Sequence, residues 1–289
     1  MGLFIFLGLA GVFIAVFFLN YYGKQWKSPE KGGFPPLWRK PLQEKVAFYN
    51  SLSEEEKEHF EYKVEEFLLN HKITGVGVEI DITDKLLVSA SAVIPIFKFD
   101  DWRYDNLFEV LVYPDHFDEN FNTEGDGRSI LGMVGTGYME GKMILSRKAL
   151  HHGFSNEKDK KNTAIHEFVH LVDKMDGKVD GIPALLLEKQ YALPWLDMIS
   201  QKMEEIYAEK SDINPYGGTN QAEFFAVASE YFFENPKALQ RKHPKLYDMM
   251  EEIFEHDMAE REQELKKTNL SRNAPCICGS GKKYKHCCG

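Results

Sequence analysis

The segment His166-Glu167-Phe168-Val169-His170 constrains this 289-residue chain more than any other stretch. Four apolar residues in and around it recur at helical spacing and predict a helix with one buried face: Ile165, Phe168, Val169 and Val172. On such a helix His166 and His170 lie one turn apart on the same side, where two imidazoles can hold one zinc ion. Glu167 beside them can accept a proton from a zinc-bound water. We expect this helix to begin near Asn156 and to stop at Gly177.

A catalytic zinc ion takes three protein ligands and keeps a further position open for water. Two carboxylates on a helix predicted to begin at Asn220 are candidates for the third ligand: Glu223 and Glu230. Glu223 lies three residues after Asn220, where it could equally be a capping residue, and Glu230 could equally be an exposed charge. The residue pattern alone leaves both open. Asp173, one turn beyond His170, either orients a ligand or is a polar residue satisfied elsewhere.

Residues 3–22 form a run of twenty residues without a charged side chain. As a helix the run would be about 30 Å long, which matches the hydrocarbon core of a bilayer. No charged residue precedes it and five basic residues follow, which places the amino terminus outside and the rest in the cytoplasm: Lys24, Lys27, Lys31, Arg39 and Lys40. A cleaved signal peptide is the alternative, but a basic start and a small-residue cleavage site are lacking. We expect a single-pass membrane anchor over residues 1–23.

A linker over residues 24–34 and a large domain over residues 35–268 are expected to follow, since Pro and Gly are frequent just before residue 36. Helices are predicted at 42–50, 53–71 (opened by a capping box at Ser53), 83–97, 184–190, 194–210, 220–234 and 244–267, with a loop at 214–218. Residues 107–113 read as a strand, and residues 133–138 and 142–146 as a hairpin. An edge strand from that hairpin could bind an extended peptide. The fold class predicted is α+β, mostly helical with a small mixed sheet.

Two segments of the chain resemble the Mlc titration factor A family of zinc peptidases, whose similarity runs from about Pro35 to Tyr247. They are His-Glu-Phe-Val-His-Leu-Val-Asp-Lys-Met-Asp-Gly at residues 166–177 and Ala-Glu-Phe-Phe-Ala-Val-Ala-Ser-Glu-Tyr-Phe-Phe at residues 222–233. The family's catalytic core in turn resembles that of anthrax lethal factor, where a Tyr-Gly-x-Thr-Asn-x-Ala-Glu-Phe-Phe segment supplies a catalytic tyrosine and a glutamate ligand. This chain has that pattern at residues 216–225. The resemblance implies a zincin-like domain, Glu223 as third zinc ligand and Tyr216 as donor to the transition state.

All four cysteines lie in the last fourteen residues: Cys276, Cys278, Cys287 and Cys288. Such a cluster is typical of a metal site in a reducing compartment and not of a distributed disulfide framework. The spacing, Cys-x-Cys followed by eight residues and Cys-Cys, resembles the SEC-C motif. The resemblance implies that residues 269–289 form a closed zinc site with four thiolate ligands and a docking module for a protein partner.

Together these patterns predict a membrane-anchored zinc peptidase that faces the cytoplasm, with one catalytic and one structural zinc ion and a peptide or protein as substrate. The formal net charge of −10 argues against direct DNA binding. Two other functions stay open. The family resemblance implies the capture of a sugar-responsive transcriptional repressor with peptidase activity secondary, and the tail could serve a membrane-tethered adaptor. The presence of both Glu167 and Tyr216 favours catalysis, because a pure binding protein needs no general base. Aminopeptidase and endopeptidase activity are not distinguished.

Overall fold

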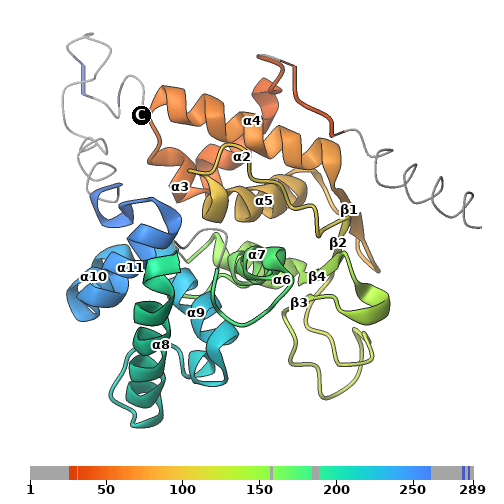
Figure 1. Ribbon diagram of the computed structural model, residues 1–289. Coiled ribbons are helices and arrows are strands. Elements are labelled where there is room, and N and C mark those ends of the chain that lie inside the picture. Colours follow the sequence, from red (N-terminus) through yellow and green to blue (C-terminus); the bar gives the residue numbers. More distant parts are fainter. Residues whose placement is uncertain are drawn as a thin grey trace, which may run out of the picture.

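The computed structural model describes residues 26–30, 32–156, 159–183 and 189–261, together with residues 282, 283 and 286. The predicted membrane anchor and the four cysteines of the tail lie outside the described residues, as does most of the helix expected at 184–190. Across the described ranges, no helix combines the length and the apolar character needed to cross a bilayer. The domain is built from helices and a small mixed sheet, as the sequence predicts (Figure 1).

The sheet has four strands in the order β1-β2-β4-β3: β1 (Lys72–Gly75), β2 (Glu109–Tyr113), β4 (Lys142–Ser146) and β3 (Gly132–Val134). β1, β2 and β4 run parallel, and β3 pairs antiparallel with β4 as an outer strand. The predicted strand and hairpin are therefore confirmed, with a 3-10 turn, η2 (Gly137–Met139), in the hairpin connection. β1 is not predicted, because four residues are too few to show an alternating pattern.

The first helices pack together at the top of Figure 1: α2 (Pro36–Lys45), α3 (Ala47–Asn50), α4 (Glu54–Asn70) and α5 (Ile82–Val93), which the 3-10 turn η1 (Ile94–Ile96) extends. The capping box predicted before α4 is present, since Ser53 and Glu56 each accept from the other's backbone N–H. α5 is buried from Leu86 to Val93 between α2, α4, α6 and α7. The β-branched residues of this stretch lower its intrinsic helix propensity. The packing against the four neighbouring helices nevertheless stabilises the helix.

The central helix, α7 (Thr163–Asp173), packs against α5, α9 and β3, and its four predicted core residues are buried. It begins later than predicted. Asn162 and not Asn156 is its N-cap, because the Asn162 side chain accepts from the Ile165 backbone N–H at 3.1 Å. A 3-10 turn, η3 (Lys174–Asp176), follows α7 and ends at Gly177, as predicted, where the backbone turns left-handed with φ of 92°.

The remaining elements are α6 (Arg147–Gly153), η4 (Lys189–Tyr191), α8 (Ala192–Tyr207), η5 (Pro215–Gly218), α9 (Gln221–Glu234), α10 (Pro236–Lys242) and α11 (Pro244–Phe254). α9 begins after Asn220 as predicted, and η5 occupies the expected loop. The single helix predicted at 244–267 is wrong. α11 ends at Phe254 because Glu255 adopts a left-handed φ of 50°, and a separate helical turn begins at Met258. The short α10, between Pro236 and Pro244, is not predicted.

A buried carboxylate joins α5 to α6. Asp84 has no exposed surface, and its Oδ1 accepts from Arg147 Nε at 2.9 Å and from His151 Nε2 at 2.6 Å. Its Oδ2 accepts from the Asp81 backbone N–H at 2.9 Å. Burial raises the pKa of Asp84, but the bonds from Arg147 and His151 outweigh burial and hold the pKa below its usual value of 3.8. The folded state therefore favours the ionised carboxylate.

We expect Asp84→Asn to lower the free energy of unfolding at pH 7 by about 2–3 kcal/mol, because a buried neutral amide replaces the carboxylate that accepts charge-assisted hydrogen bonds from Arg147 and His151. Urea denaturation measures the change. Glu54→Gln is the matched control, since Glu54 forms an exposed ion pair with Lys57 and should change stability by less than about 1 kcal/mol. The Asp84 contribution should be complete above about pH 4 and be lost as pH falls further, because the folded-state pKa is the lower one. Equal effects of the two substitutions would contradict this role.

Candidate active site

Three side chains that the sequence predicts as zinc ligands converge between α7 and α9. His166 and His170 lie one turn apart on α7, with their Nε2 atoms 3.1 Å apart. Glu223, near the start of α9, places its Oε2 3.0 Å from His166 Nε2 and 3.4 Å from His170 Nε2. They form the one cluster of three potential metal-binding side chains within the described part of the chain.

The two carboxylates that the residue pattern leaves open both contact His166, on different nitrogens. Glu223 is also the N3 residue of α9, since its backbone N–H donates to the Asn220 side chain at 2.9 Å. The capping position and the position beside the histidines are therefore compatible. Glu230, two turns further along α9, accepts from His166 Nδ1 at 2.8 Å and from the Asn162 backbone N–H at 2.7 Å. It joins the start of α7 to the ring of His166.

The donor atoms fit a zinc ion in both spacing and protonation. Ligand atoms about 2.0–2.1 Å from zinc at tetrahedral angles are separated by roughly 3.3 Å, close to the 3.0–3.4 Å found here. An ionised carboxylate such as that of Glu230 can only accept, so His166 Nδ1 carries a proton, and loss of the second ring proton would leave a lone pair at Nε2. That lone pair faces an oxygen of Glu223 and a nitrogen of His170. A metal ion between these atoms, or a proton on one of the ring nitrogens, would remove the repulsion between the lone pairs.

The pKa values of His166 and Glu223 show that this position also favours a proton when no metal ion is bound. Burial lowers the pKa of His166, but hydrogen bonds to Glu223 and Glu230 outweigh burial and raise it to about 10. Burial raises the pKa of Glu223, but the bonds from His166 and His170 outweigh it and lower the value to about 2. A proton and a metal ion therefore compete for one position, and the ionised Glu223 favours either cation.

Glu167 lies against the edge strand. Its side chain is buried, and burial raises the pKa of its carboxyl group. A Cβ atom at Gly132 would lie 2.7 Å from Glu167 Oε1 and 2.8 Å from Thr163 Cγ2, closer than nonbonded atoms approach. Gly132 therefore lets β3 lie directly beside the predicted general base. Gly132 is not predicted as a site residue from the sequence, although a glycine at the start of a hairpin strand can signal a close backbone approach.

Tyr216, on η5, lies beside the histidine pair. Its ring centroid is 6.0 Å from that of His166, at an angle of 37°, and its side chain is half exposed to the cleft. Burial and then the negative charges of Glu223 and Glu167 raise the pKa of the phenol. The hydroxyl therefore stays protonated at neutral pH and can donate a hydrogen bond.

Asp173 fits the second of the two roles that the sequence leaves open with one oxygen only, since its buried Oδ1 has no hydrogen-bond partner among the described residues. Its Oδ2 accepts from the Gly181 backbone N–H at 2.9 Å, which fastens the turn after η3 to the end of α7. Burial raises the pKa of Asp173 to about 6. The carboxylate that holds a predicted ligand is instead Glu230, through His166 Nδ1.

The predicted site residues line a cleft of about 1060 Å³ between β3 and α8. Its α8 wall is formed by Ser200, Met203, Glu204 and Tyr207. On the β3 wall, Gly135 N–H donates to the Lys142 carbonyl and Ser146 N–H to the Leu131 carbonyl. Because the bonding alternates along an antiparallel strand, the backbone groups of Gly132 and Val134 point away from β4. The backbone N–H and C=O groups of these two residues of β3 can therefore form hydrogen bonds with an extended chain.

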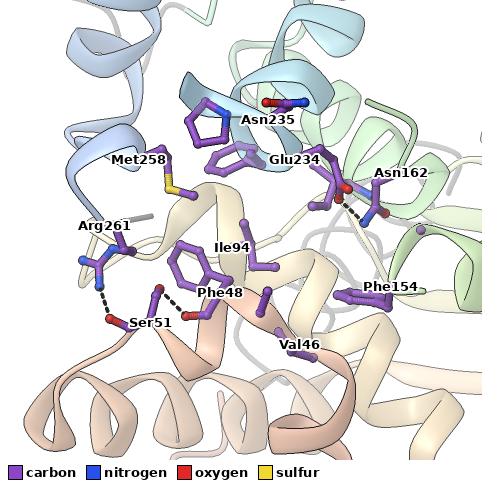
Figure 2. Close-up of a pocket in the computed structure, with 15 residues that line it drawn as sticks. Val46, Phe48, Ser51, Ile94, Phe154, Asn162, Glu234, Asn235, Met258 and Arg261 are labelled. Atoms are coloured by element: carbon purple, nitrogen blue, oxygen red, sulfur yellow. Dashed lines mark hydrogen bonds between the residues drawn. The ribbon is translucent and has the colours of Figure 1, made fainter. Parts of the chain in front are cut away.

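A second, smaller pocket of about 120 Å³ lies where the start of α7 meets α3, η1 and the end of α9. Figure 2 shows Phe48, Ile94 and Phe154 around it, with Asn162 donating to Glu234 at 3.0 Å. None of the predicted catalytic or zinc-binding residues lines this pocket. The predicted chemistry therefore belongs to the cleft between β3 and α8.

The chain is similar to known proteins both over its domain and over its tail. The SEC-C motif matches residues 272–289, which include all four cysteines. Mlc titration factor A of Pectobacterium atrosepticum is 26% identical, over 78% of this chain and 88% of that protein. Its namesake from Escherichia fergusonii is 28% identical, over 73% and 83%. The uncharacterized protein slr2042 of Synechocystis sp. is 29% identical, over 76% and 84%.

The two resemblances expected from the sequence are therefore confirmed. The model of the family described as glucose-regulated metallo-peptidase M90 matches residues 22–255, which include the cleft and every residue predicted to act in it. With most of its length matched, this chain belongs to the glucose-regulated metallo-peptidase M90 family.

Proposed function

We propose that this chain is a membrane-anchored zinc peptidase that hydrolyses peptide bonds in a peptide or protein substrate. The observation that carries the proposal is the meeting of His166, His170 and Glu223 donor atoms within 4.8 Å, beside the buried Glu167. A site built only to bind a partner would not need a carboxylate with a raised pKa next to a metal-binding cluster.

His166, His170 and Glu223 would hold the ion, and Glu230 keeps the His166 ring oriented with its Nε2 lone pair toward the ligand position. Zinc, when bound, lowers the pKa of a water molecule and polarises the scissile carbonyl. Glu167 accepts the proton of the attacking water and passes it to the leaving amine. Tyr216 donates a hydrogen bond to the oxyanion that develops on the carbonyl oxygen.

The substrate would lie extended along β3. The backbone groups of Gly132 and Val134 that point away from β4 can pair with the substrate backbone, and α8 closes the opposite side of the cleft. This mode favours unfolded segments, because a residue in a helix or sheet has already paired its backbone groups.

The tail would hold a second zinc ion through Cys276, Cys278, Cys287 and Cys288 and dock a protein partner. The SEC-C match supports this site, and four thiolates leave no coordination position for a substrate. Two zinc ions per chain are thus proposed, one catalytic and one structural.

A regulatory role is the second candidate. The name of the relatives, Mlc titration factor A, associates those proteins with the Mlc repressor. Capture of a transcriptional repressor by this chain would make hydrolysis secondary. A repressor that binds the wild type and Glu167→Gln equally, with no peptide cleaved by either, would favour this role.

The first test is cleavage of a peptide library by the full chain. Wild type should cleave, and Glu167→Gln should lose activity while keeping its zinc, because the amide retains the shape but cannot accept the proton. Mass spectrometry of the products also separates removal of terminal residues from internal cleavage. Near wild-type cleavage by Glu167→Gln would refute the proposed mechanism.

Zinc content distinguishes the two carboxylates. Glu223→Gln should reduce zinc from two ions per chain to one, because a neutral amide oxygen is a much poorer zinc ligand than a carboxylate. Glu230→Gln should keep both ions and weaken affinity at the catalytic site by about 10–100-fold, as expected for a residue that orients a ligand. Elemental analysis and competition with a chelator measure both. The reverse pattern would make Glu230 the ligand.

Tyr216→Phe should leave zinc content and KM close to wild type and lower kcat. The loss of one hydrogen-bond donor to an oxyanion costs about 3 kcal/mol, which corresponds to a hundredfold or more in rate. Steady-state kinetics on a peptide found in the library measures it. Tyr207→Phe is the matched control, because the Tyr207 hydroxyl lines the same cleft but donates to the Gly218 carbonyl. An unchanged kcat for Tyr216→Phe would assign this residue to packing alone.

The membrane anchor has its own test. The basic residues after the uncharged run at 3–22 should keep the catalytic domain in the cytoplasm and the run uncleaved. Protease added to intact cells should spare the domain, and the same protease should digest it once the cells are opened. Digestion in intact cells, or a mature chain that begins after Tyr22, would refute the anchor.

A further inference from the structure

The first described residues are fastened to one place on the domain. The Trp26 ring packs edge-on against His71, with centroids 5.6 Å apart, and the Arg103 guanidinium lies 5.1 Å from the Trp26 ring centroid. The backbone N–H of Lys27 donates to the Asn70 side chain at 2.9 Å, and that side chain donates back to the Lys27 carbonyl at 2.7 Å. The chain thus enters the domain where α4 ends and β1 begins, at the right of Figure 1.

This attachment limits how far that part of the domain can lie from a membrane. The uncharged run ends at Tyr22, and Trp26 follows four residues later. Four residues span at most about 14 Å when fully extended. If residues 3–22 cross the bilayer, the surface around Trp26 must lie within that distance of the end of the membrane-spanning segment.

The surface next to Trp26 is the edge at which the three parallel strands begin. Lys72, Glu109 and Lys142 are aligned across β1, β2 and β4, so these strand ends are level. Phe108, one residue before β2, is 54% exposed, and Leu69, at the end of α4, is 41% exposed. The Phe108 ring lies against Gly141, where a Cβ atom would come within 2.2 Å of it. The contact with Gly141 holds the aromatic side chain at the end of the hairpin.

Basic side chains lie at the same edge of the domain. Lys27, Lys72 and Arg103 are exposed, and Lys142 is 41% exposed. Glu109 is largely buried and lies within ion-pair distance of both Lys72 and Lys142, and Asp105 is an exposed acid nearby. An exposed aromatic ring and a leucine among lysine and arginine side chains suit the interface of a bilayer that contains anionic lipids.

We infer that this edge of the domain, formed by Leu69, Lys72, Arg103, Phe108 and Lys142, rests on the lipid surface in which the chain is anchored. The inference depends on the proposed membrane anchor and adds to it the orientation of the domain relative to the membrane. The contact between Trp26 and the domain acts as a strap, so the catalytic domain has one fixed side toward the membrane and does not tumble on a loose linker. Apolar contact and attraction to anionic headgroups then act on the same surface.

Photocross-linking tests the orientation. The full chain is reconstituted in vesicles of phosphatidylethanolamine and phosphatidylglycerol, with p-benzoylphenylalanine at position 69, 108 or 193. Leu193 is the control because it is 73% exposed and lies on α8, away from β1 and β2 in Figure 1. Illumination should give phospholipid adducts, detected by mass spectrometry, at positions 69 and 108 and not at 193.

Trp26→Ala provides the second arm. It should reduce the adducts at positions 69 and 108 while flotation with vesicles and peptide cleavage stay unchanged, because it releases the strap but not the anchor. Floating protein that gives no lipid adduct at 69 and 108, gives equal adducts at 193, or cross-links there to a second copy of the chain would overturn the inference. Protein that fails to float with the vesicles would instead refute the anchor itself.

Discussion

His166 is bonded by a carboxylate at each of its ring nitrogens, and the rest of the site depends on this arrangement. Glu230 holds Nδ1 and thereby determines which nitrogen carries the proton, while Glu223 faces Nε2. Both carboxylates come from α9, so the packing of α7 against α9 is also the assembly of the site. Glu230 further accepts the Asn162 backbone N–H, which links the start of α7 to the orientation of its first histidine.

Much of the fold follows from local signals in the sequence. The capping box at Ser53, the apolar stripe of α7 and the start of α9 after Asn220 are each determined by residues only a few positions apart. The errors occur where local signals compete or are weak. Asn156 and Asn162 are both good capping residues, and only packing decides between them. Glu255 ends α11 in a left-handed conformation that its residue type does not favour, so the sequence carries no clear signal for that break.

Some residues of the candidate site can be predicted from the sequence and others cannot. His166, Glu167 and His170 are neighbours in sequence, so the helical period alone brings the two histidines together. Glu223 and Glu230 share a face of α9, and no local rule says which of them meets Nε2 of a histidine more than fifty residues away. The resemblance in residues 216–225 selects Glu223, and the spacing of the donor atoms agrees with that choice. Gly132 has no side chain, so its importance appears only when Glu167 is seen beside it.

Gly132 bears on how catalysis and substrate binding would be coupled in the proposed peptidase. In the proposed binding mode, a peptide paired with β3 would lie one backbone thickness from Glu167, because Gly132 places no side chain between β3 and the carboxylate. A larger residue at position 132 would have to move either the strand or the general base. Moving the strand shifts the peptide relative to the ligand cluster, and moving Glu167 shifts the proton acceptor relative to the attacking water. Because proton transfer needs hydrogen-bond distances, either displacement would lower the rate while leaving the metal ligands in place.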